Sequence, residues 1–449
     1  MPNDILKEHF EIPQVSMFRF LKNALKILKN PLPFHHQNFI SKGDNFKLNI
    51  GFRSQVIFSR DAGLAEYILQ KNQKNYTKSK IQTRDLVKYV GQGLLTSEGD
   101  LWKKQRQLIQ PAFHKKHLAN LLYTIQLAVK EEYKQIEATK TIDVFPIFND
   151  LAFQTVVKSL FSSAANSEEI QRLQYITESA QKMLVRELRQ PYLGWWFRIS
   201  GTLKHHLDLT RKAREILKKI VNERQQSTQR NYDLLDMLLD ARYEDGNAMD
   251  EEQLIDEILI LFTAGHETTS NALTFTFQLL AKNPEWQERI FEEIQKNLNT
   301  EDLMNFVMAS KVCQQVIEEA MRLYPPAYFI DRVNIDEDFY NGMKFEKNSN
   351  LLLSIYEIHR HPKLWEEPNE FHPERFHEGG RKYSSQYFPF GAGPRKCIGN
   401  NFAMFEMILA VTELIKHYRV FPEFDSIQIT PLITLKPKNA FLRFEERDA

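Results

Sequence analysis

Hydrophobic positions recur every three or four residues through the middle of the chain, from about residue 80 to about residue 325. This spacing places them on one face of an α-helix, so we expect a largely helical body. Residues 45–60 instead contain two short apolar runs typical of paired strands, followed by a helix near 62–72, and strand-like runs return at 343–356 and in the C-terminal tail. The pattern predicts a mainly α protein with a small β portion.

The 449 residues contain no internal repeat, low-complexity tract or flexible linker, so we expect one domain over 1–449. Its β-rich part should comprise about 40–75, about 325–360 and the tail, and its helical part about 80–325 and about 390–420. Basic and acidic side chains nearly cancel, 59 against 58, which argues against a nucleic-acid partner.

The cysteines and the N-terminus indicate the cellular compartment. Only Cys313 and Cys397 occur, which excludes a disulfide framework and favours a reducing environment. No run reaches the roughly 18–20 uncharged apolar residues that cross a bilayer. Asp4, Lys7, Glu8 and Glu11 interrupt the start before the core of a signal peptide can develop. We therefore expect a cytoplasmic protein without a membrane anchor.

Residues 17–30 carry a basic amphipathic pattern. Its apolar face comprises Phe18, Leu21, Leu25 and Leu28, and its lysines off that face are Lys22, Lys26 and Lys29. Such a helix can rest on a membrane surface. We expect instead that the apolar face docks on the body of the protein.

The segment from Phe390 to Gly399 reads Phe-Gly-Ala-Gly-Pro-Arg-Lys-Cys-Ile-Gly, and its three glycines and one proline predict a loop. A helical pattern follows from about Asn400 to Tyr418. Cys397 therefore lies just before a helix N-terminus, where unpaired N–H groups and the helix dipole favour the thiolate form. On these residues alone, a buried structural cysteine in a tight turn is the alternative.

The same segment resembles the haem-binding loop of the cytochrome P-450 family, the haem-thiolate monooxygenases. The family pattern Phe-x-x-Gly-x-x-x-Cys-x-Gly, with an arginine before the cysteine, is matched by Phe390, Gly393, Arg395, Cys397 and Gly399. The resemblance implies that the cofactor is haem b, iron protoporphyrin IX, that Cys397 is the axial ligand of the iron, and that Arg395 pairs with a propionate. Phe390 and Gly399 complete the cofactor-binding loop. Thiolate ligation favours cleavage of the O–O bond.

A second pattern lies in the run 251–281, where Gly265 and Thr268 interrupt an apolar helical stripe beside Glu267. One long helix, or two helices joined at the glycine, would fit these residues. The six residues that begin at Ala264 resemble the family's central helix, in which small side chains leave room for oxygen and an acid and an alcohol deliver protons. The resemblance makes Thr268 the alcohol and Glu267 the acid, with Ala264 and Gly265 beside the haem.

A third pattern combines Glu319 and Arg322, which share a turn of a predicted helix. Most such pairs are surface salt bridges, which is the alternative here. The pair resembles the family's Glu-x-x-Arg motif, completed by Arg375 in Phe-His-Pro-Glu-Arg-Phe. The resemblance implies a buried, structural cluster that braces the haem loop.

The fourth pattern is Trp102 and Arg106, whose indole N–H and guanidinium lie one helical turn apart and can donate to the same carboxylate. A tryptophan that packs on a solvated basic helix is the alternative. The family has a Trp-x-x-x-Arg motif that holds the haem propionates, so the resemblance assigns that role to both residues. Arg332 matches a further propionate-binding arginine.

The resemblance also implies a fold and an activity. The fold is a triangular helical prism in which the haem lies between the long central helix and the helix after the cysteine loop. The activity is insertion of one oxygen atom from O2 into a C–H bond of a small organic substrate. No Gly-x-Gly-x-x-Gly motif follows a predicted strand, so electrons should come from a separate ferredoxin or flavodoxin with its NAD(P)H reductase. We expect a monomer.

Several lysines predict where that redox partner binds. They are Lys103, Lys104, Lys115, Lys116 and Lys396, and they should make the cysteine side of the haem basic. Such a surface would attract an acidic partner. Ordinary solvated lysines are the alternative.

The substrate is poorly encoded. By analogy with the family, residues 78–100, 258–268 and 327–329 line the pocket and 183–197 form its roof. Their aromatic side chains suit a small, partly apolar ligand or a stacked sugar. The chain also resembles marine bacterial members of the family that remove the methyl group of 6-O-methyl-D-galactose as formaldehyde. Hydroxylation of a fatty acid or a terpenoid is the alternative.

Other functions of a haem-thiolate protein would leave the acid and the alcohol unused. A peroxide-driven hydroxylase, a non-catalytic gas sensor, and a dehydratase or isomerase do not need this pair. The presence of both Glu267 and Thr268 therefore favours a monooxygenase.

Overall fold

The computed structural model describes residues 11–50, 54–162, 167–300 and 302–447. Of the four residues on which the signal-peptide expectation rests, Asp4, Lys7 and Glu8 lie outside the described residues. The chain forms two compact units, each assembled from three separate segments. Unit 1 comprises Met1–Ser79, Arg322–Glu370 and Gly380–Cys397, and unit 2 comprises Lys80–Met321, Phe371–Gly379 and Ile398–Ala449.

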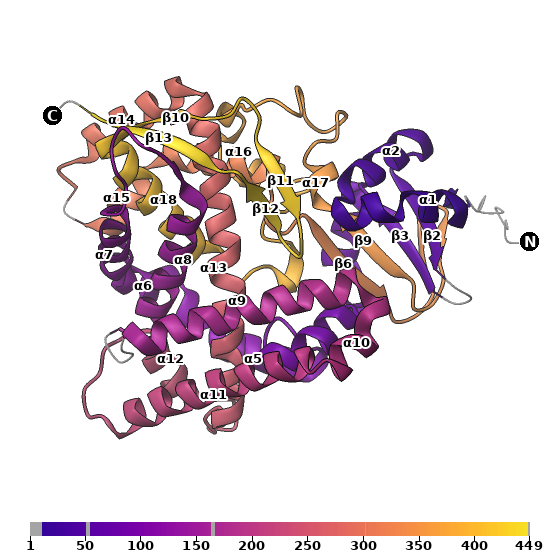
Figure 1. Cartoon of the computed structure of the whole chain (residues 1–449), viewed down its shortest axis with the longest axis horizontal. Helices are drawn as coiled ribbons and strands as arrows, with labels where there is room; N and C mark the ends of the chain where they lie inside the picture. The colour runs from indigo at the N-terminus through magenta and orange to yellow at the C-terminus, as the bar shows by residue number, and fades with distance from the viewer. Residues whose placement is uncertain (1–10, 51–53, 163–166, 301, 448–449) are drawn as a thin grey trace, which may run out of the picture. The chain divides into compact units, whose positions relative to one another are not determined.

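Unit 1 is built on a mixed β-sheet (Figure 1). In spatial order its strands are β1 (Gln14–Val15), β2 (Asn45–Ile50), β3 (Ser54–Ser59), β9 (Asn350–Ser354), β6 (Phe329–Asn334) and β4 (Tyr76–Thr77). Strands β2 and β3 pair antiparallel, as expected for residues 45–60, whereas β3 and β9 pair parallel with Ile57 opposite Leu351. Both of these side chains are buried in the core of the unit.

The remaining elements of unit 1 are helices and one small hairpin. They are α1 (Met17–Lys29), α2 (Leu32–Lys42), α3 (Ala62–Glu66), the π-helix η1 (Tyr67–Lys71), the 3-10 helix η2 (Gln73–Asn75), the hairpin of β7 (Asp338–Tyr340) and β8 (Met343–Phe345), α17 (Ile355–Ile358), and the 3-10 helices η8 (Gly380–Tyr383) and η9 (Gly393–Arg395). An aromatic cluster of Phe34, Phe39, Phe46 and Phe58 forms a second core between α2 and the strand pair β2–β3.

Unit 2 is predominantly helical. Its longer helices are α5 (Gly99–Ile109), α7 (Leu122–Tyr133), α8 (Val144–Phe161), α9 (Ser167–Arg189), α11 (Thr202–Gln226), α13 (Glu251–Lys282), α14 (Pro284–Asn297), α16 (Lys311–Leu323, which ends in unit 1) and α18 (Asn400–His417). Its shorter helices are η3 (Ile81–Leu86), α4 (Val87–Val90), η4 (Gln110–Phe113), α6 (Lys115–Leu118), η5 (Ala119–Leu121), η6 (Pro191–Leu193), α10 (Gly194–Ile199), α12 (Leu234–Asp240), α15 (Leu303–Ala309) and η7 (Pro373–Phe376). Two small sheets complete it, one ordered β10 (Tyr418–Pro422), β13 (Phe441–Glu446) and β5 (Thr141–Asp143), the other a hairpin of β11 (Gln428–Pro431) and β12 (Leu435–Lys438). The expectation of a mainly α protein with a small β portion is confirmed.

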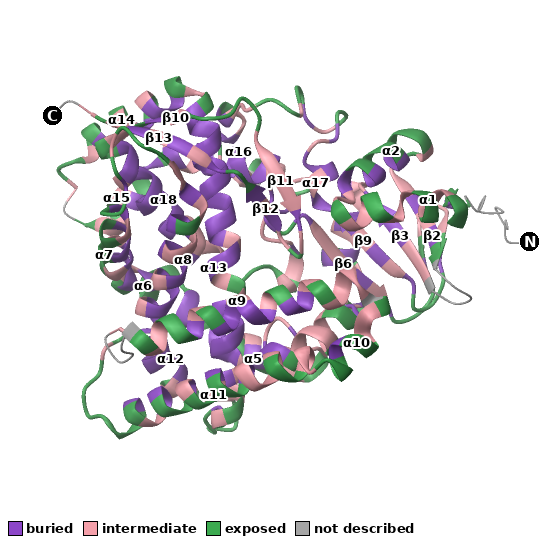
Figure 2. Cartoon of the chain, in the orientation of Figure 1, coloured by how far each residue is buried: buried purple, intermediate pink, exposed green. Residues whose placement is uncertain are grey.

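Helix α13 is one continuous helix, so the alternative of two helices joined at Gly265 is wrong. Asp250 caps its start by accepting the N–H of Gln253 at 2.8 Å, and two glutamates follow in the first turn, where they complement the helix dipole. The whole span from Thr269 to Ala281 is buried (Figure 2). At Gly265 itself the helix packs closely on α8, because an added Cβ there would meet the Val156 side chain at 3.0 Å. Packing against neighbouring helices thus holds α13 together through its glycine.

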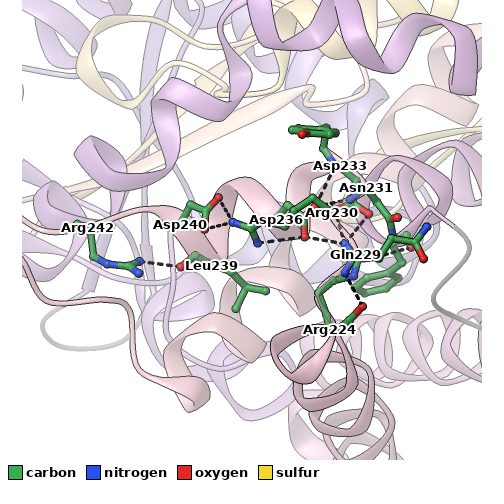
Figure 3. A network of polar contacts seen from close by, with 12 residues as sticks. Arg224, Gln229, Arg230, Asn231, Asp233, Asp236, Leu239, Asp240 and Arg242 are labelled. Atoms are coloured by element: carbon green, nitrogen blue, oxygen red, sulfur yellow. Dashed lines mark hydrogen bonds and ion pairs between the residues drawn. The ribbon is translucent and has the colours of Figure 1, made fainter.

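A buried ionic network closes the connection between α11 and α12 (Figure 3). The Arg224 guanidinium binds Asp233 at 2.8 Å and Asp236 at 2.9 Å. Asp233 also caps α12, and Asp236 accepts the N–H groups of Asn231 and Tyr232. Each carboxylate therefore has a cation and a backbone donor, which is the condition under which a buried ion pair is tolerated.

The N-terminal helix α1 docks on unit 1 through a different face from the one expected. Its half-buried residues Phe20 and Ile27 pack against the aromatic core. Phe18, Leu21 and Leu25, which we expected to dock, are exposed. The helix is apolar on two sides, and the aromatic Phe20 contacts the Phe34 ring at 6.3 Å between centroids. In the described part of the chain, no helix is both long enough and apolar enough to pass through a bilayer.

Candidate active site

Cys397 lies at the end of a loop in unit 1 that is fixed by its own backbone. The N–H of Cys397 donates to the carbonyl of Phe390 at 2.9 Å, and the N–H of Lys396 donates to the carbonyl of Gly393 at 3.1 Å. Helix α18 begins three residues later, with Gly399 as its N-cap. The predicted order of loop, cysteine and helix N-terminus is confirmed.

Gly393 is required by the shape of this loop. Its φ angle of 68° is in the left-handed region, and a Cβ added there would collide with the backbone carbonyl of Leu69 in η1. Gly399 differs, because its φ is −87° and an added Cβ would meet only the Phe113 ring at 3.9 Å. Gly393 is thus needed for packing of the protein itself, and Gly399 is not.

Buried Arg322 supports the chain that leads into the loop. Its guanidinium donates to the carbonyls of His359 at 2.8 Å, Pro368 at 2.7 Å and Glu370 at 2.8 Å, all in unit 1. The His359 ring in turn accepts the N–H of Phe388 at 2.9 Å, two residues before the loop's first aromatic residue. Sequence reasoning missed this histidine, because nothing in its local pattern indicates a partner 29 residues away.

In unit 2, Glu319 is fully buried and its carboxylate accepts the N–H of His372 at 2.8 Å. The Arg375 Nε lies 3.5 Å from the same oxygen. Glu319 and Arg375 therefore meet as expected, and the alternative of a surface salt bridge is wrong. Their position in the interior indicates a structural role, since burial makes each charge dependent on its partners.

The two cysteines have opposite environments. Cys313 in α16 is buried, and burial raises the pKa of its thiol well above the usual value. Cys397 is exposed at the end of its loop. The description of an inert buried cysteine thus applies to Cys313, and Cys397 has the accessibility that a metal ligand requires.

Along α13, one narrow stripe of unit 2 is open within a helix that is otherwise largely buried. Ala264 is exposed, and Leu261, Gly265 and Thr268 are half-buried. These positions follow the i, i+3, i+4, i+7 spacing of a single face. The Thr268 hydroxyl donates to the carbonyl of Ala264 at 2.8 Å. An alcohol thus lies in an accessible stripe whose other members are apolar.

Glu267 is held by the C-terminal hairpin, a contact that sequence reasoning missed. The Thr434 hydroxyl donates to its Oε1 at 2.8 Å, and the Lys436 Nζ lies 3.6 Å from the same oxygen. Asn271 donates to the Thr434 oxygen at 3.0 Å, and Lys436 also lies over the Phe145 ring at 4.9 Å. The carboxylate therefore has a fixed hydroxyl donor and a fixed cation.

His266 does not add a second titratable group to this stripe. It is buried, and burial lowers the pKa of its imidazole. Its Nδ1 lies 2.7 Å from the carbonyl of Phe262. Its environment favours the neutral form, bonded to its own helix.

The other predicted cofactor contacts are placed as follows. Trp102 and Arg106 lie one turn apart on α5 of unit 2, as expected, and Arg106 Nε donates to Gln110 at 3.1 Å. Arg332 lies on β6 of unit 1, is largely buried, and donates to the carbonyl of Asp331 at 2.7 Å. The indole and both guanidiniums are of the chemical type that binds carboxylates.

The segments expected to line a substrate pocket differ in how firmly they are held. In unit 2, the loop after α4 is bound by two carboxylates of α13: Asp256 accepts the N–H of Gln92 at 2.7 Å, and Glu257 accepts that of Leu94 at 3.0 Å. Trp195 and Trp196 of α10 were expected in the roof of the pocket. Their side chains are instead exposed, by 60% for Trp195 and 50% for Trp196.

Each unit, taken by itself, contains residues of the kind that bind haem. Unit 1 offers one accessible thiol on a loop whose backbone is already fixed, and unit 2 offers an open stripe of small residues beside an alcohol and an acid. Among the residues that the structure describes, no group of three or more His, Cys, Asp or Glu side chains could hold a metal ion. A single thiolate suits an iron whose other ligands come from a porphyrin.

Comparison with known proteins gives a consistent result. A family model described as Cytochrome P450 matches residues 13–444. Cytochrome P450 CYP72A613 of Trigonella foenum-graecum is 31% identical over 414 residues, which cover 86% of this chain and 77% of that protein. The 11-oxo-beta-amyrin 30-oxidase of Medicago truncatula is 30% identical over 434 residues, covering 90% and 80%. The crystal structure of cytochrome P450DA heme domain superposes with a TM-score of 0.87 at 21% identity and covers 98% of both chains, which shows that the fold is shared.

Proposed function

Because the chain belongs to the cytochrome P450 family of haem monooxygenases, we propose that Cys397 is the thiolate ligand of its haem iron and that Glu267 and Thr268 deliver protons during oxygen activation. The observation that carries this assignment is the accessible cysteine on a backbone-fixed loop directly before α18. When bound, the haem activates O2 and supplies the oxidant for a C–H bond.

The protein's own groups hold the cofactor in this proposal. The N-terminal end of α18 stabilises negative charge on the Cys397 sulfur. Trp102, Arg106, Arg332 and Arg395 would donate to the haem propionates, and Phe390, Gly399, Ala264 and Gly265 would border the ring. Buried Arg322 and the Glu319–Arg375 pair keep the surrounding backbone in place.

Proton delivery uses two adjacent residues of α13. The Thr268 hydroxyl can turn from the Ala264 carbonyl toward the open stripe and pass on a proton. Glu267 is the acid that supplies Thr268 with a replacement proton. Thr434 and Lys436 keep its carboxyl group in one position for this transfer. A fixed acid next to a fixed alcohol is the arrangement that general acid catalysis requires.

The substrate in our proposal is apolar, such as a terpenoid or a fatty acid. The open stripe of α13 presents Leu261, Ala264 and Gly265 around a single hydroxyl, and a mostly apolar lining with few polar groups selects such ligands. One relative carries 11-oxo-beta-amyrin, a triterpenoid, in its name. The relatives described above are from plants and give no support to removal of the methyl group of 6-O-methyl-D-galactose by a marine bacterial enzyme, which is the alternative substrate.

Members of the family need electrons from redox partners. We place the docking surface of an acidic ferredoxin or flavodoxin on unit 2, at the exposed lysines Lys103 and Lys104 of α5 and Lys115 and Lys116 of α6. Oppositely charged surfaces steer such encounters. The test replaces Lys103 and Lys104 by glutamate and compares reduction rates over a range of salt concentrations with those of a control variant, Lys204→Glu/Lys212→Glu on α11. Equal reduction rates in the two variants would show that the redox partner does not dock at these lysines.

Three further features complete the proposal. The chain passes repeatedly between the two units, so neither is a continuous stretch of sequence, which supports one domain over 1–449. The two-cysteine composition supports work in a reducing, cytoplasmic environment. A monomer is sufficient for the chemistry, because the cysteine, the acid and the alcohol all belong to one chain.

The experiment that tests the function has two stages. First, the CO-difference spectrum of the reduced protein reports a thiolate-ligated haem. Second, terpenoids, fatty acids and 6-O-methyl-D-galactose are incubated with O2, NAD(P)H and a surrogate redox system, and the products are examined for one atom of isotopically labelled oxygen. Formaldehyde release would favour the methyl ether, whereas a labelled hydroxyl group on a terpenoid or fatty acid would favour the apolar substrate. A normal spectrum with no oxygen insertion into any member of the panel would contradict the proposed substrate classes.

A further inference from the structure

Helix α1 is firmly attached to unit 1 by one face. The Ser16 hydroxyl caps its start by accepting the N–H of Arg19 at 3.3 Å, and the N–H of Asn30 closes its end on the Lys26 carbonyl at 2.8 Å. On the inner side, Phe20 and Ile27 pack against the aromatic core of the unit. The orientation of the opposite face is therefore fixed.

That opposite face carries apolar side chains, and Figure 2 shows exposed residues along α1. The exposed fractions are 79% for Phe18, 63% for Leu21 and 83% for Leu25, at spacings of three and four residues that form one ridge. Large apolar side chains in a contiguous exposed ridge indicate an interaction surface rather than ordinary surface composition.

A row of lysines runs beside this ridge. Lys22, Lys26 and Lys29 are exposed, and no ion pair found among the described residues involves them. The whole chain has a net charge of only +1, yet residues 12–43 contain Arg19, Lys22, Lys26, Lys29 and Lys42 and no acidic residue. Positive charge is thus concentrated at the ridge.

From this arrangement we propose that α1 binds in the plane of a membrane surface rich in anionic lipid. Phe18, Leu21 and Leu25 enter the boundary between headgroups and acyl chains, and the lysines meet the lipid phosphates and carboxylates. The ridge is convex and about 10 Å long at 1.5 Å per residue, on a helix about 20 Å long. A convex ridge inserts into a deformable lipid surface, whereas a folded protein would have to provide a matching groove.

The test uses the full-length holoprotein and sedimentation with large vesicles. The vesicles contain phosphatidylcholine alone or phosphatidylcholine with phosphatidylserine, at low and high salt. We expect binding only to the anionic vesicles, and weaker binding at high salt, because salt screens the lysines. The CO-difference spectrum of each variant verifies that the haem site is intact, so that failure of membrane binding is distinguishable from failure of the proposed function.

Two variants separate the ridge from the lysines. Phe18→Ser/Leu21→Ser/Leu25→Ser should lower the vesicle partition coefficient by roughly a hundredfold or more. Lys22→Gln/Lys26→Gln/Lys29→Gln should lower it by roughly a hundredfold on anionic vesicles. The matched control is Tyr123→Ser/Leu127→Ser, which removes an exposed apolar pair of α7 in unit 2 and should bind like the unmodified protein.

Three results would overturn the proposal. The first is no binding to anionic vesicles. The second is equal binding of the serine variant and the unmodified protein, which would move the contact to another surface. The third is concentration-dependent dimerisation in sedimentation velocity that the serine variant loses, without vesicle binding, which would assign the ridge to a second copy of the chain.

Discussion

Unit 1 and unit 2 hold their candidate functional residues by different means. In unit 1, the loop that carries Cys397 depends on backbone fit, because Gly393 lies against the carbonyl of Leu69. In unit 2, Glu267 on α13 is held by two side chains, the Thr434 hydroxyl and the Lys436 ammonium. The close backbone contact at Gly393 leaves no space for even one added atom. The two side-chain contacts of Glu267 can instead be removed one at a time by substitution. Changes in unit 1 should therefore abolish the haem site, and changes in unit 2 should alter the rate.

The largest effect is expected from Cys397→Ala in unit 1. Without the thiolate the CO-difference spectrum should lose the band of a thiolate-ligated haem, and monooxygenase activity should disappear. The control is Cys313→Ala, which removes a buried thiol and should keep both the band and the activity. That control should cost about 1 kcal/mol of unfolding free energy from the small cavity. Retention of the band in Cys397→Ala would falsify the assignment of the ligand.

The next largest effect is expected from Gly393→Ala, because one added carbon would force the loop away from Leu69. Its φ of 68° adds strain to this collision. We expect most of the protein to be purified without haem, and a loss of stability of about 3 kcal/mol. Haem content per chain and urea unfolding measure the two outcomes.

Gly379→Ala is the matched control for this change. Gly379 has a similar φ of 79°, but nothing lies within 4 Å of an added Cβ. It should show only the strain of the left-handed conformation, about 1 kcal/mol, and normal haem content. If both variants bound haem equally well, the backbone fit to Leu69 would not be what fixes the loop.

In unit 2, Lys436→Met should slow the reaction without removing the haem. Glu267 would keep its Thr434 contact but lose the neighbouring cation, so its position as a proton donor would become less defined. We expect kcat to fall by about tenfold, with KM nearly unchanged, and a larger share of the electrons to end in hydrogen peroxide. A larger solvent deuterium isotope effect on kcat would tie the loss to proton transfer.

Lys436→Arg and Lys438→Met test whether this effect is specific. The arginine restores a cation beside Glu267 and should recover most of the rate. Lys438 is exposed two residues farther along β12, and its change to methionine should have no effect. Should Lys438→Met slow turnover as much as Lys436→Met, general surface charge would explain the result and the positioning role would be lost.

The same contrast explains what could be predicted from the sequence. The Cys397 loop and the start of α18 follow from adjacent residues, since glycine, proline and the helical repeat act locally. Thr434 lies 167 residues from Glu267, and no local pattern indicates that contact. Continuity of α13 through Gly265 also required knowledge of the burial around it, because glycine alone weakens a helix.

The face by which α1 docks could not be predicted either. Its sequence is apolar on two sides, so periodicity alone gave no reason to prefer Phe20 and Ile27 over the Phe18–Leu25 ridge. The choice depends on which side chains find aromatic partners, such as the Phe34 ring that meets Phe20. Those partners come from the next helix of the unit and are not visible in the repeat of α1 itself.

The smallest effect on activity is expected where unit 2 buries an acid to which it offers no such partners. Glu406 of α18 is fully buried, and among the described residues neither of its oxygens has a hydrogen-bond partner. Burial raises the pKa of Glu406 well above its ordinary value of 4.5, which the nearby Thr155 hydroxyl offsets only in part. The folded protein therefore keeps this carboxyl protonated.

Glu406→Gln should consequently change how stability depends on pH, with little effect at acidic pH. Above pH 4.5 the unfolded chain releases the Glu406 proton and the folded protein keeps it, so rising pH favours unfolding. This group alone lowers the free energy of unfolding by about 1.4 kcal/mol per pH unit until the folded carboxyl also ionises. The glutamine has the size of the neutral acid and no proton to release. Urea midpoints of the variant should therefore match those of the unmodified protein near pH 4.5 and exceed them increasingly as the pH rises, until the folded carboxyl ionises. Parallel pH curves for the two proteins would mean that Glu406 is ionised in the folded state, and that unit 2 supplies a partner for it after all.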